Sequence, residues 1–578
     1  MALNLSFLDF FDSVGKAALK AVEHEVEWFC LPAGQMLFAE GEPSDALYLL
    51  RSGALAAFRD GAMGRPNLLG YIRAGEPVGE MSMLEERPHS ASVYAMRDSE
   101  VVRLPTASFE RLADKHPSLM RELSKMMLRR LRAGPQRNGS EPKVFALVAC
   151  SPTIDLDYRA RKLQTALARI GVTSAIVGDE AADWQGPRLE QYEHDHQIVL
   201  LTASLGDPNW ARRAMGRADR VWLLARGDAR PSLPLLPDDP SPAARLKLLD
   251  VILVHDGGDR RATRPEEWAD AADAARVFHW REEQQNDLKR LARTLAGKSI
   301  GLVLSGGGAR AYAHIGAVDA FRKAGIEFDF IGGASMGAII AAGVALEWSQ
   351  DELVDRVHDA FVKSNPLGDW QLPVISLARG NRVDERLEEH FGDVEIPDLA
   401  RPFFCVSSNL SNGRPFVHRR GRLRDALRAT IAIPGILPPV IQNENVLVDG
   451  AVFTNFPSEQ MKAFHRGVSA GSDVTRAKGV NPDDFRNAPG FFGWIRQHGF
   501  NELPPIASLL MRSATAGVMV GKHEAYQEAV DLLVLPETDT DLRQWKKYEE
   551  TVDAGRRSAE FAISELSRDE RGAFGLTV

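Results

Sequence analysis

The chain has 578 residues, of which 44% are hydrophobic and 26% charged, and its formal net charge at pH 7 is −9. This length exceeds what one hydrophobic core supports, so we expect several domains. The negative charge argues against nucleic acid as a partner, and against adhesion to an anionic membrane by charge alone.

The N-terminal stretch MALNLSFLDFFDSVGKAALK lacks the basic and then apolar pattern of a secretory signal. The longest weakly polar run, residues 331–346, is shorter than the ~20 residues that a membrane span needs. Three cysteines lie far apart without a CxxC spacing, which predicts neither a disulfide framework nor a metal site and suits a reducing compartment. We therefore expect a cytoplasmic protein, at most peripheral on the inner face of the membrane.

The first segment, residues 1–133, predicts a β-barrel of the jelly-roll kind. Apolar strands alternate with glycine-containing turns at intervals of about 8–12 residues, which is typical of this architecture. A helical stretch follows the strands, and the polar stretch GPQRNGSEP at residues 134–142 predicts a linker.

The second segment, residues 143–297, alternates apolar strands with helical stretches. Continuous apolar strands between helices are typical of a parallel α/β sheet that is buried on both faces. The first strand leads into SPTIDLDYRARK, which lacks the GxxxxGK[ST] pattern of a phosphate-binding loop. We expect a scaffold domain here, without a nucleotide site.

The third segment opens on the strand SIGLVL and on three consecutive glycines, Gly306, Gly307 and Gly308. Backbone without side chains can approach a ligand closely, and the following helix adds partial positive charge. A phosphate fits this loop, and so does the oxyanion of an acyl-transfer intermediate. With Ala311 and Asp329 the loop also matches the dinucleotide pattern GxGxxG/A, so the loop alone leaves these interpretations open.

The stretch GGASMG at residues 332–337 favours the oxyanion interpretation. It lies between an apolar strand and an apolar helix, the context of a nucleophile elbow in which Ser335 takes a strained backbone conformation. A second G-x-S-x-G, at residues 467–471, follows a charged helical stretch and precedes no apolar helix. We therefore interpret Ser469 as a loop or strand residue.

A nucleophilic serine needs a base. None of the later histidines lies in a glycine-flanked or strand-end context that singles it out. They are His358, His390, His418, His465, His498 and His523. Asp449 is the better candidate, because the apolar strand VLV ends on Asp-Gly-Ala, where a carboxylate would project beyond the sheet toward Ser335. The other Asp-Gly pairs, at residues 60–61 and 256–257, lie in the other segments and are typical of turns.

SGGGAR, GASMG and DGA, with AIPGILPPV ahead of the last, resemble the patatin-like phospholipase family. The resemblance covers residues 298–578 and departs from the family at Ala311, where glycine is commoner. It implies an α/β hydrolase domain with a Ser–Asp dyad and no histidine, in which Ser335 is the nucleophile and Asp449 the general base. It also implies an oxyanion hole formed by the amides of the three glycines, with Arg310 supporting their loop.

The implied chemistry is acyl transfer without a cofactor or a metal. Asp449 removes the proton of Ser335, the serine attacks an ester carbonyl, and Asp449 later activates the water that releases a fatty acid. A free aspartate with a pKa of about 3.9 is a poor base at neutral pH. We therefore expect burial to raise the basicity of Asp449.

Two stretches of the first segment, LPAGQMLFAEGEPSDALYLLRSGALAAF and VGEMSMLEERPHSASV, resemble a cyclic-nucleotide-binding domain. Gly79 and Glu80 match the glycine and the ribose-binding glutamate of its phosphate-binding cassette. The family then has Pro-Arg, whereas this chain has Pro88 and His89, followed by Ser90. Histidine is mostly neutral at pH 7 and arginine is a fixed charged fork. We therefore favour a degenerate regulatory or assembly module, with cyclic nucleotide binding as the alternative.

This order of domains resembles the bacterial relatives of neuropathy target esterase. That resemblance implies a phospholipid or lysophospholipid substrate, with the N-terminal half regulating or localising the enzyme. Two apolar stretches, residues 368–377 and 489–495, are candidates for contact with a membrane surface or for the core. A ligand-sensing protein with an inactive hydrolase scaffold is one alternative, and an NAD(P)-dependent oxidoreductase is another. The sequence predicts no oligomeric state.

Overall fold

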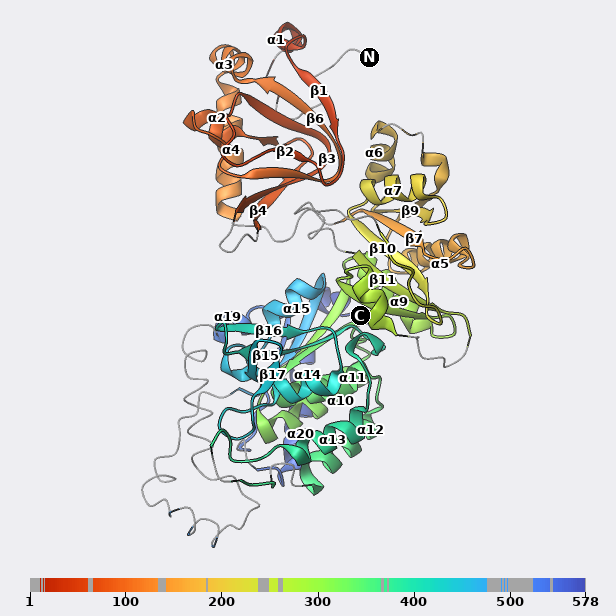
Figure 1. The fold of residues 1–578 in the computed structure, drawn as a ribbon, viewed down its shortest axis with the longest axis vertical. Coiled ribbons are helices and arrows are strands. Elements are labelled where there is room, and N and C mark those ends of the chain that lie inside the picture. The colour runs from red at the N-terminus through yellow and green to blue at the C-terminus, as the bar shows by residue number, and fades with distance from the viewer. Residues whose placement is uncertain are drawn as a thin grey trace. The chain divides into compact units, whose positions relative to one another are not determined.

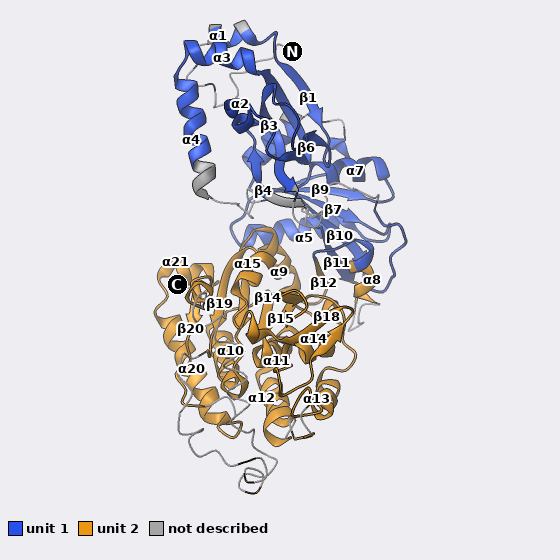
Figure 2. Cartoon of the chain, turned by 60° about the vertical axis from the view of Figure 1, so that its left-hand side comes forward, with its two compact units in different colours: residues 1–254, 270–275 blue, residues 255–269, 276–578 orange. Residues whose placement is uncertain are grey.

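The computed structural model (Figure 1) divides into two compact units, shown in Figure 2: residues 1–254 with 270–275, and residues 255–269 with 276–578. Each unit contains its own hydrophobic core. The structure describes residues 11, 14, 16–60, 66–133, 142–182, 184, 186–236, 249–257, 264–364, 368–371, 374–475, 490, 493, 496, 523–540 and 544–576.

The first unit begins with an antiparallel sheet in which the strand order is β1-β6-β3-β4, with β2 on β6 and β5 on β3. Its elements are α1 (Lys16–Val22), β1 (Glu27–Leu31), β2 (Met36–Phe38), β3 (Ala46–Asp60), β4 (Pro66–Arg73), β5 (Pro77–Val78), α2 (Glu80–Glu85), β6 (Ser92–Pro105), α3 (Thr106–Lys115) and α4 (Ser118–Ala133). Side chains that alternate along β3 and β6 form two apolar clusters, one inside the curved sheet and one beneath the helices. The expected N-terminal β-barrel is confirmed.

The next sheet has six strands in the order β12-β11-β10-β7-β9-β8, where β12 is Arg276–Arg281, and its neighbours from β11 to β8 are parallel. Its elements are β7 (Val144–Ala149), α5 (Leu156–Arg169), β8 (Ser174–Val177), α6 (Gly186–Asp195), β9 (Ile198–Ser204), α7 (Pro208–Arg217), β10 (Arg220–Arg226) and β11 (Leu249–His255). Every side chain of β7 is buried, because helices connect the strands and cover the sheet. The expected parallel α/β architecture is confirmed.

The second unit contains an eight-stranded sheet in the order β17-β18-β15-β14-β13-β19-β20, with β16 paired to β15. Its strands are β13 (Ser299–Leu304), β14 (Phe330–Ala334), β15 (Phe403–Asn409), β16 (Arg414–His418), β17 (Val440–Gln442), β18 (Asn445–Asp449), β19 (Gly467–Ser472) and β20 (Leu532–Val534); β12 (Arg276–Arg281) lies outside this sheet. The neighbours among β15, β14, β13, β19 and β20 are parallel. Their carboxyl ends therefore meet at one edge, where α/β sites form.

Helices surround this sheet and bury its apolar side chains. The helices of this part of the chain are α8 (Pro265–Ala271), α9 (Gln285–Leu295), α10 (Tyr312–Ala324), α11 (Ser335–Ala345), α12 (Gln350–His358), α13 (Asn381–Phe391), α14 (Leu423–Thr430), α15 (Ser458–Phe464), α19 (His523–Gln527), α20 (Tyr548–Ser564) and α21 (Arg568–Ala573). All eleven residues of α11 are buried, which fits its apolar sequence. This helix is the central element of the hydrolase part of the chain.

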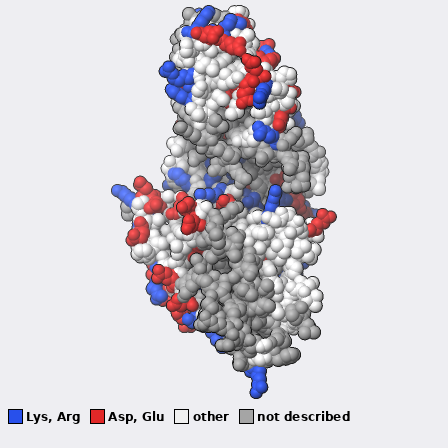
Figure 3. All heavy atoms as spheres, turned by 90° about the vertical axis from the view of Figure 1, so that its left-hand side faces the viewer, with Lys and Arg blue, Asp and Glu red and all other residues white. Residues whose placement is uncertain are grey.

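Two surface properties bear on partners. Within the described residues, no helix is both long enough and apolar enough to cross a bilayer. On the face drawn in Figure 3, basic and acidic side chains are interspersed. That distribution differs from the clustered basic surface of nucleic-acid-binding proteins.

Candidate active site

A sharp turn joins β14 to α11, and Ser335 is the first residue of that helix. Its φ angle of 49° lies in the left-handed region, which serine rarely occupies. Two residues on, a Cβ atom added to Gly337 would lie 2.3 Å from the carbonyl oxygen of Ser305, so only glycine permits this close packing of helix and strand. The turn has the geometry of a nucleophile elbow.

The carboxylate of Asp449 lies at the carboxyl end of β18 and is fully buried. The hydroxyl of Ser335 donates a hydrogen bond to its Oδ2 at 2.6 Å, and the N–H of Ala451 donates to its Oδ1 at 2.8 Å. Burial raises the pKa of Asp449 to about 6, although both hydrogen bonds act in the opposite direction. The aspartate is therefore a stronger base than a free one, in contact with the serine that it would deprotonate.

One stretch, which we call the connecting segment (Thr430–Leu437), holds the backbone of both residues. The hydroxyl of Thr430 accepts a hydrogen bond from the N–H of Ser335 at 2.9 Å and donates to the carbonyl of Val406. The carbonyl of Ala432 accepts from the N–H of Asp449 at 2.9 Å. The motif AIPGILPPV is readable in the sequence, but no local signal singles out Thr430.

The glycine loop lies beside the candidate nucleophile, since a Cβ atom added to Gly306 would lie 3.0 Å from Cβ of Ser335. The N–H of Gly306 donates to the carbonyl of Asn455 at 3.1 Å, and Nδ2 of Asn455 donates back to the carbonyl of Gly306 at 3.1 Å. The N–H of Gly306 therefore already has an acceptor, whereas the sequence analysis expected it to donate to the oxyanion. For Gly307 and Gly308, no acceptor of the amide occurs among the described residues.

Two buried side chains lie beside that loop. The guanidinium of Arg310 donates to the carbonyl of Val474 at 3.4 Å, next to the glycines that it was expected to support. His314 contacts the hydroxyl of Ser472 and the carbonyl of Ser305, each at 2.9 Å. Burial lowers the pKa of His314 to about 4, so the ring is neutral at pH 7. Its role is structural. The sequence analysis did not single out His314 or Asn455.

The described histidines have no hydrogen bond to Ser335. His418 contacts Ser407 at 2.7 Å, and His465 contacts Ser469 at 3.1 Å. Burial lowers the pKa of both rings to about 4. Among the other candidates, the ring of His358 packs edge-on against Tyr548, and the pKa of His390 is lowered by burial; His498 lies outside the described residues.

Ser469, the serine of the second G-x-S-x-G, lies in the middle of β19 and is 2% exposed. It pairs with Gly301 across the sheet, three residues before the end of β13, and its N–H donates to Asp531 at 2.8 Å. A serine nucleophile must reach a substrate at the edge of the sheet. The position of Ser469 agrees with its interpretation as a strand residue.

Asp329 lies at the amino end of β14, opposite to the edge that carries the glycines. It forms a two-pronged ion pair with Arg293, at 2.6 and 2.9 Å, and also accepts from the N–H of Ile300. In a dinucleotide fold the acidic residue binds ribose at the carboxyl end of its strand. The oxidoreductase alternative therefore loses its support.

In the barrel, Gly79 has a φ angle of 87° and precedes α2, whose first residue, Glu80, is buried. His89 is 4% exposed and stacks on Phe38, with ring centroids 3.7 Å apart. Burial lowers the pKa of His89, and its Nδ1 has no hydrogen-bond partner within the described part of the chain. The side chain in the place of the arginine is thus neutral and packed inward.

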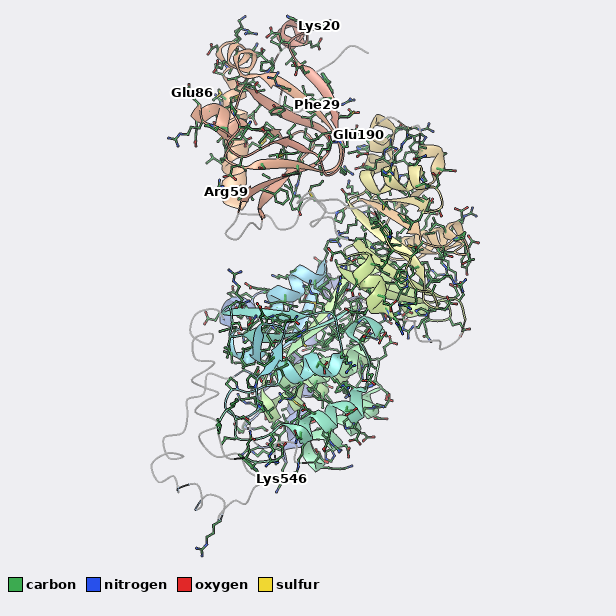
Figure 4. All side chains as sticks on the ribbon, in the orientation of Figure 1. Lys20, Phe29, Arg59, Glu86, Glu190 and Lys546 are labelled. Carbon is green, nitrogen blue, oxygen red and sulfur yellow. The ribbon has the colours of Figure 1, made fainter. Side chains whose placement is uncertain are left out.

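Two other residues of this stretch, Ser90 and Glu86, face solvent. Ser90 is exposed, and its carbonyl accepts from Nε of Arg59 at 3.1 Å. Glu86, which ends α2, extends away from the barrel (Figure 4). None of these contacts resembles a preformed phosphate site.

One group of described residues has ligand atoms close enough together for a metal ion, namely Asp359, Glu389 and His390, within 4.8 Å of one another. These side chains are partly exposed and belong to a π-helical turn (Asp359–Lys363) and to α13. No residue of the predicted dyad or of the glycine loop is among them.

The comparisons with known proteins agree with this geometry. Residues 302–462 match the model of the patatin-like phospholipase family, and residues 29–116 match the cyclic nucleotide-binding domain. The chain therefore contains a patatin-like phospholipase domain and, ahead of it, a cyclic nucleotide-binding domain.

Its relatives are proteins of the NTE family. An uncharacterized NTE family protein of Mycobacterium tuberculosis is 29% identical over 94% of this chain and 93% of its own length. Lysophospholipase nte1 of Aspergillus terreus is 26% identical over 84% of this chain, and patatin-like phospholipase domain-containing protein 6 of Homo sapiens is 27% identical over 76% of it. The chain spans only 38% and 37% of the lengths of these two proteins.

Among solved structures, the catabolite activator protein of Thermus thermophilus matches 28% of this chain and 66% of its own, at 25% identity and a TM-score of 0.20.

Proposed function

We propose that this enzyme releases fatty acids from phospholipids or lysophospholipids with Ser335 as nucleophile and Asp449 as general base. The observation that carries the proposal is the 2.6 Å hydrogen bond from the strained serine to a buried carboxylate. The lipid substrate is supported by the family match and by a relative named as a lysophospholipase.

In the acylation step, Asp449 takes the proton of Ser335 as the serine oxygen attacks the carbonyl carbon of the ester. The negative charge that develops on the carbonyl oxygen needs donors at the glycine loop, and Gly307 and Gly308 are the glycines whose amides stay available. When the tetrahedral intermediate collapses, the bond to the alcohol breaks, and Asp449 returns the proton to the leaving oxygen.

In the deacylation step, Asp449 takes a proton from water, and the resulting nucleophile attacks the acyl-serine. The same amides stabilise the second tetrahedral intermediate, which releases a fatty acid and restores the hydroxyl of Ser335. A single carboxylate therefore acts as base and acid in both steps. This requires a pKa nearer to neutrality than that of a free aspartate, in line with the value of about 6.

The test is to incubate the full chain with long-chain lysophosphatidylcholine and to measure fatty acid release, followed by labelling with a fluorophosphonate and peptide mapping. We expect release by the wild type, loss of it in Ser335→Ala, and an adduct on Ser335. Ser469→Ala is the matched control, because it removes the hydroxyl of the other G-x-S-x-G. An adduct on Ser469, or equal release by Ser335→Ala, would contradict the proposal.

For the N-terminal half we propose a regulatory or localising role. We also propose that the enzyme acts at the cytoplasmic surface of the inner membrane. The second candidate function, a ligand sensor with an inactive hydrolase scaffold, predicts no fatty acid release by the wild type. The strained serine and its bonded aspartate argue against it, because strain of this kind persists mainly where it serves a site.

A further inference from the structure

Two adjacent aliphatic side chains of the second unit lie almost wholly in solvent. Val374 is 93% exposed and Ile375 is 67% exposed, whereas the next three residues, Ser376 to Ala378, are buried. Residues 370–378 contain no charged residue. Apolar surface in water costs free energy in proportion to its area, so this exposed pair needs a partner that removes it from water.

Backbone hydrogen bonds join the residues on the two sides of the exposed pair. The N–H of Gln371 donates to the carbonyl of Leu377 at 2.9 Å, and the N–H of Arg379 donates to the carbonyl of Asp369 at 3.0 Å. Because the backbone is tied on both sides, the pair is displayed at a fixed place on the hydrolase part of the chain.

The buried residues that follow the exposed pair are hydrogen-bonded to the connecting segment of the active site. The N–H of Leu377 donates to the carbonyl of Gly435, and the N–H of Ala378 donates to the carbonyl of Ile436, each at 2.9 Å. The connecting segment in turn holds the backbone N–H of Asp449 and, through a threonine hydroxyl, that of Ser335. A short path of hydrogen bonds therefore links the exposed pair to both dyad residues.

Positive charge lies next to the exposed pair. Arg379 and Arg382 follow it within eight residues, and both are exposed. Aliphatic side chains flanked by arginine suit the surface of a phospholipid bilayer, where acyl chains take up the apolar groups and phosphates attract the guanidinium groups. A groove on another protein would also cover the pair, but only a lipid surface would present the acyl ester to Ser335 at the same time.

We propose that Val374 and Ile375 insert into the surface of a phospholipid bilayer, with Arg379 at the lipid phosphates, and so dock the hydrolase part on its substrate. The inference rests on the proposed function for the identity of the partner. The docking itself is measurable without hydrolysis, so the two proposals fail separately.

The experiment uses the full chain with vesicles of phosphatidylcholine, with and without phosphatidylglycerol, and a water-soluble short-chain ester as a second substrate. The variant Val374→Ser with Ile375→Ser should bind vesicles at least tenfold more weakly and hydrolyse vesicle lipid correspondingly more slowly, while it keeps its rate on the soluble ester. Arg379→Glu should weaken binding to both kinds of vesicle, and more strongly to those that contain phosphatidylglycerol, which carry net negative charge. Phe561→Ser is the matched control, because Phe561 is also 67% exposed and belongs to α20.

Unchanged vesicle binding by the double variant would overturn the proposal, and so would equal losses in the Phe561→Ser control. Hydrogen exchange of the wild type provides a second measurement that needs no variant: vesicles should protect the amides of residues 374–380, and absence of protection overturns docking at this place. Vesicle binding without hydrolysis of either ester would support docking and refute the proposed function.

Discussion

The pKa of Asp449 sets the first prediction at the scale of single residues. The proposed mechanism needs the carboxylate form, and burial raises its pKa to about 6. We expect kcat/KM on a soluble ester to be constant above pH 7 and to fall nearly tenfold per pH unit well below pH 6. A rate that does not change between pH 5 and pH 8 would contradict the assignment.

The same pKa shift separates loss of activity from loss of folding. Because the native state holds this proton more tightly than the unfolded chain does, the contribution of Asp449 to stability is fully present below the unfolded pKa of about 3.9 and is lost as the pH rises through about 6. This residue therefore stabilises the fold in the acidic range where the activity falls. Melting curves recorded at each pH serve as the control.

Thr430 carries the second prediction. Its hydroxyl is the acceptor for the N–H of Ser335 and is fully buried. Thr430→Val keeps the shape but leaves that N–H without an acceptor, at a cost of about 1–3 kcal/mol. We expect kcat to fall by a factor of ~10–100, with KM changed little, whereas Thr430→Ser keeps the hydroxyl and most of the activity.

A merely structural role of Thr430 would instead lower the melting temperature and leave the fluorophosphonate labelling rate of the folded enzyme unchanged. Labelling rates of Thr430→Val and Thr430→Ser, measured below their melting temperatures, distinguish the two cases. Equal rates in both variants would refute the positioning role.

At the scale of elements, what the sequence could predict depends on how far apart the contacting residues lie. The strand, turn and helix around Ser335 are adjacent in the chain, so the apolar pattern and the glycines predicted them. The bond from Ser335 to Thr430 joins positions 95 apart, and the bond from Asn455 to Gly306 joins positions 149 apart. Such contacts follow from the packing of β18, β15 and β14 and leave no local pattern.

The pairing of α10 with α20 carries the third prediction, because two glycines bring these helices into backbone contact. A Cβ atom on Gly316 would lie 1.8 Å from the carbonyl oxygen of Val552, and one on Gly555 would lie 1.8 Å from that of Ala313. Since α10 follows the glycine loop directly, a shift of α10 would also move the oxyanion donors. We expect Gly555→Ala to destabilise the chain by about 1–3 kcal/mol, as overpacking does.

Urea unfolding of Gly555→Ala, compared with Gly572→Ala, measures this effect. Gly572 lies in α21, where an added Cβ atom would meet nothing within 4 Å. Alanine has the higher helix propensity, so we expect the control to be neutral or slightly stabilised. Equal free energies of unfolding in the two variants would contradict the prediction, because they would show that α10 and α20 can move apart without loss of stability.

At the scale of the whole molecule, the sequence predicted the classes of the domains, and the alternation of strands and helices through residue 297 marks no limit within the middle segment. The compact division counts residues 276–297 with the second unit, although β12 is a strand of the six-stranded sheet. Side chains of α9 account for this, because Arg293 pairs with Asp329 and Arg290 donates to the carbonyl of Ala400.

The barrel carries the last prediction, which concerns regulation of the whole enzyme. A cyclic nucleotide brings one phosphate charge, and a domain that binds it needs a charged or hydrogen-bonding partner for that phosphate. His89 offers no positive charge, and its buried ring is stacked on Phe38. We expect cyclic AMP and cyclic GMP to change neither the melting temperature nor the rate of ester hydrolysis.

A ligand at 100 times its dissociation constant would stabilise the folded chain by about 2.7 kcal/mol, which a melting curve detects easily. His89→Arg is the informative variant, since it restores the residue of the family cassette while Gly79 and Glu80 stay in place. A ligand-dependent shift in His89→Arg alone would locate the loss of binding at this position. A shift in the wild type would contradict the prediction and show that the phosphate is held by other groups of the barrel.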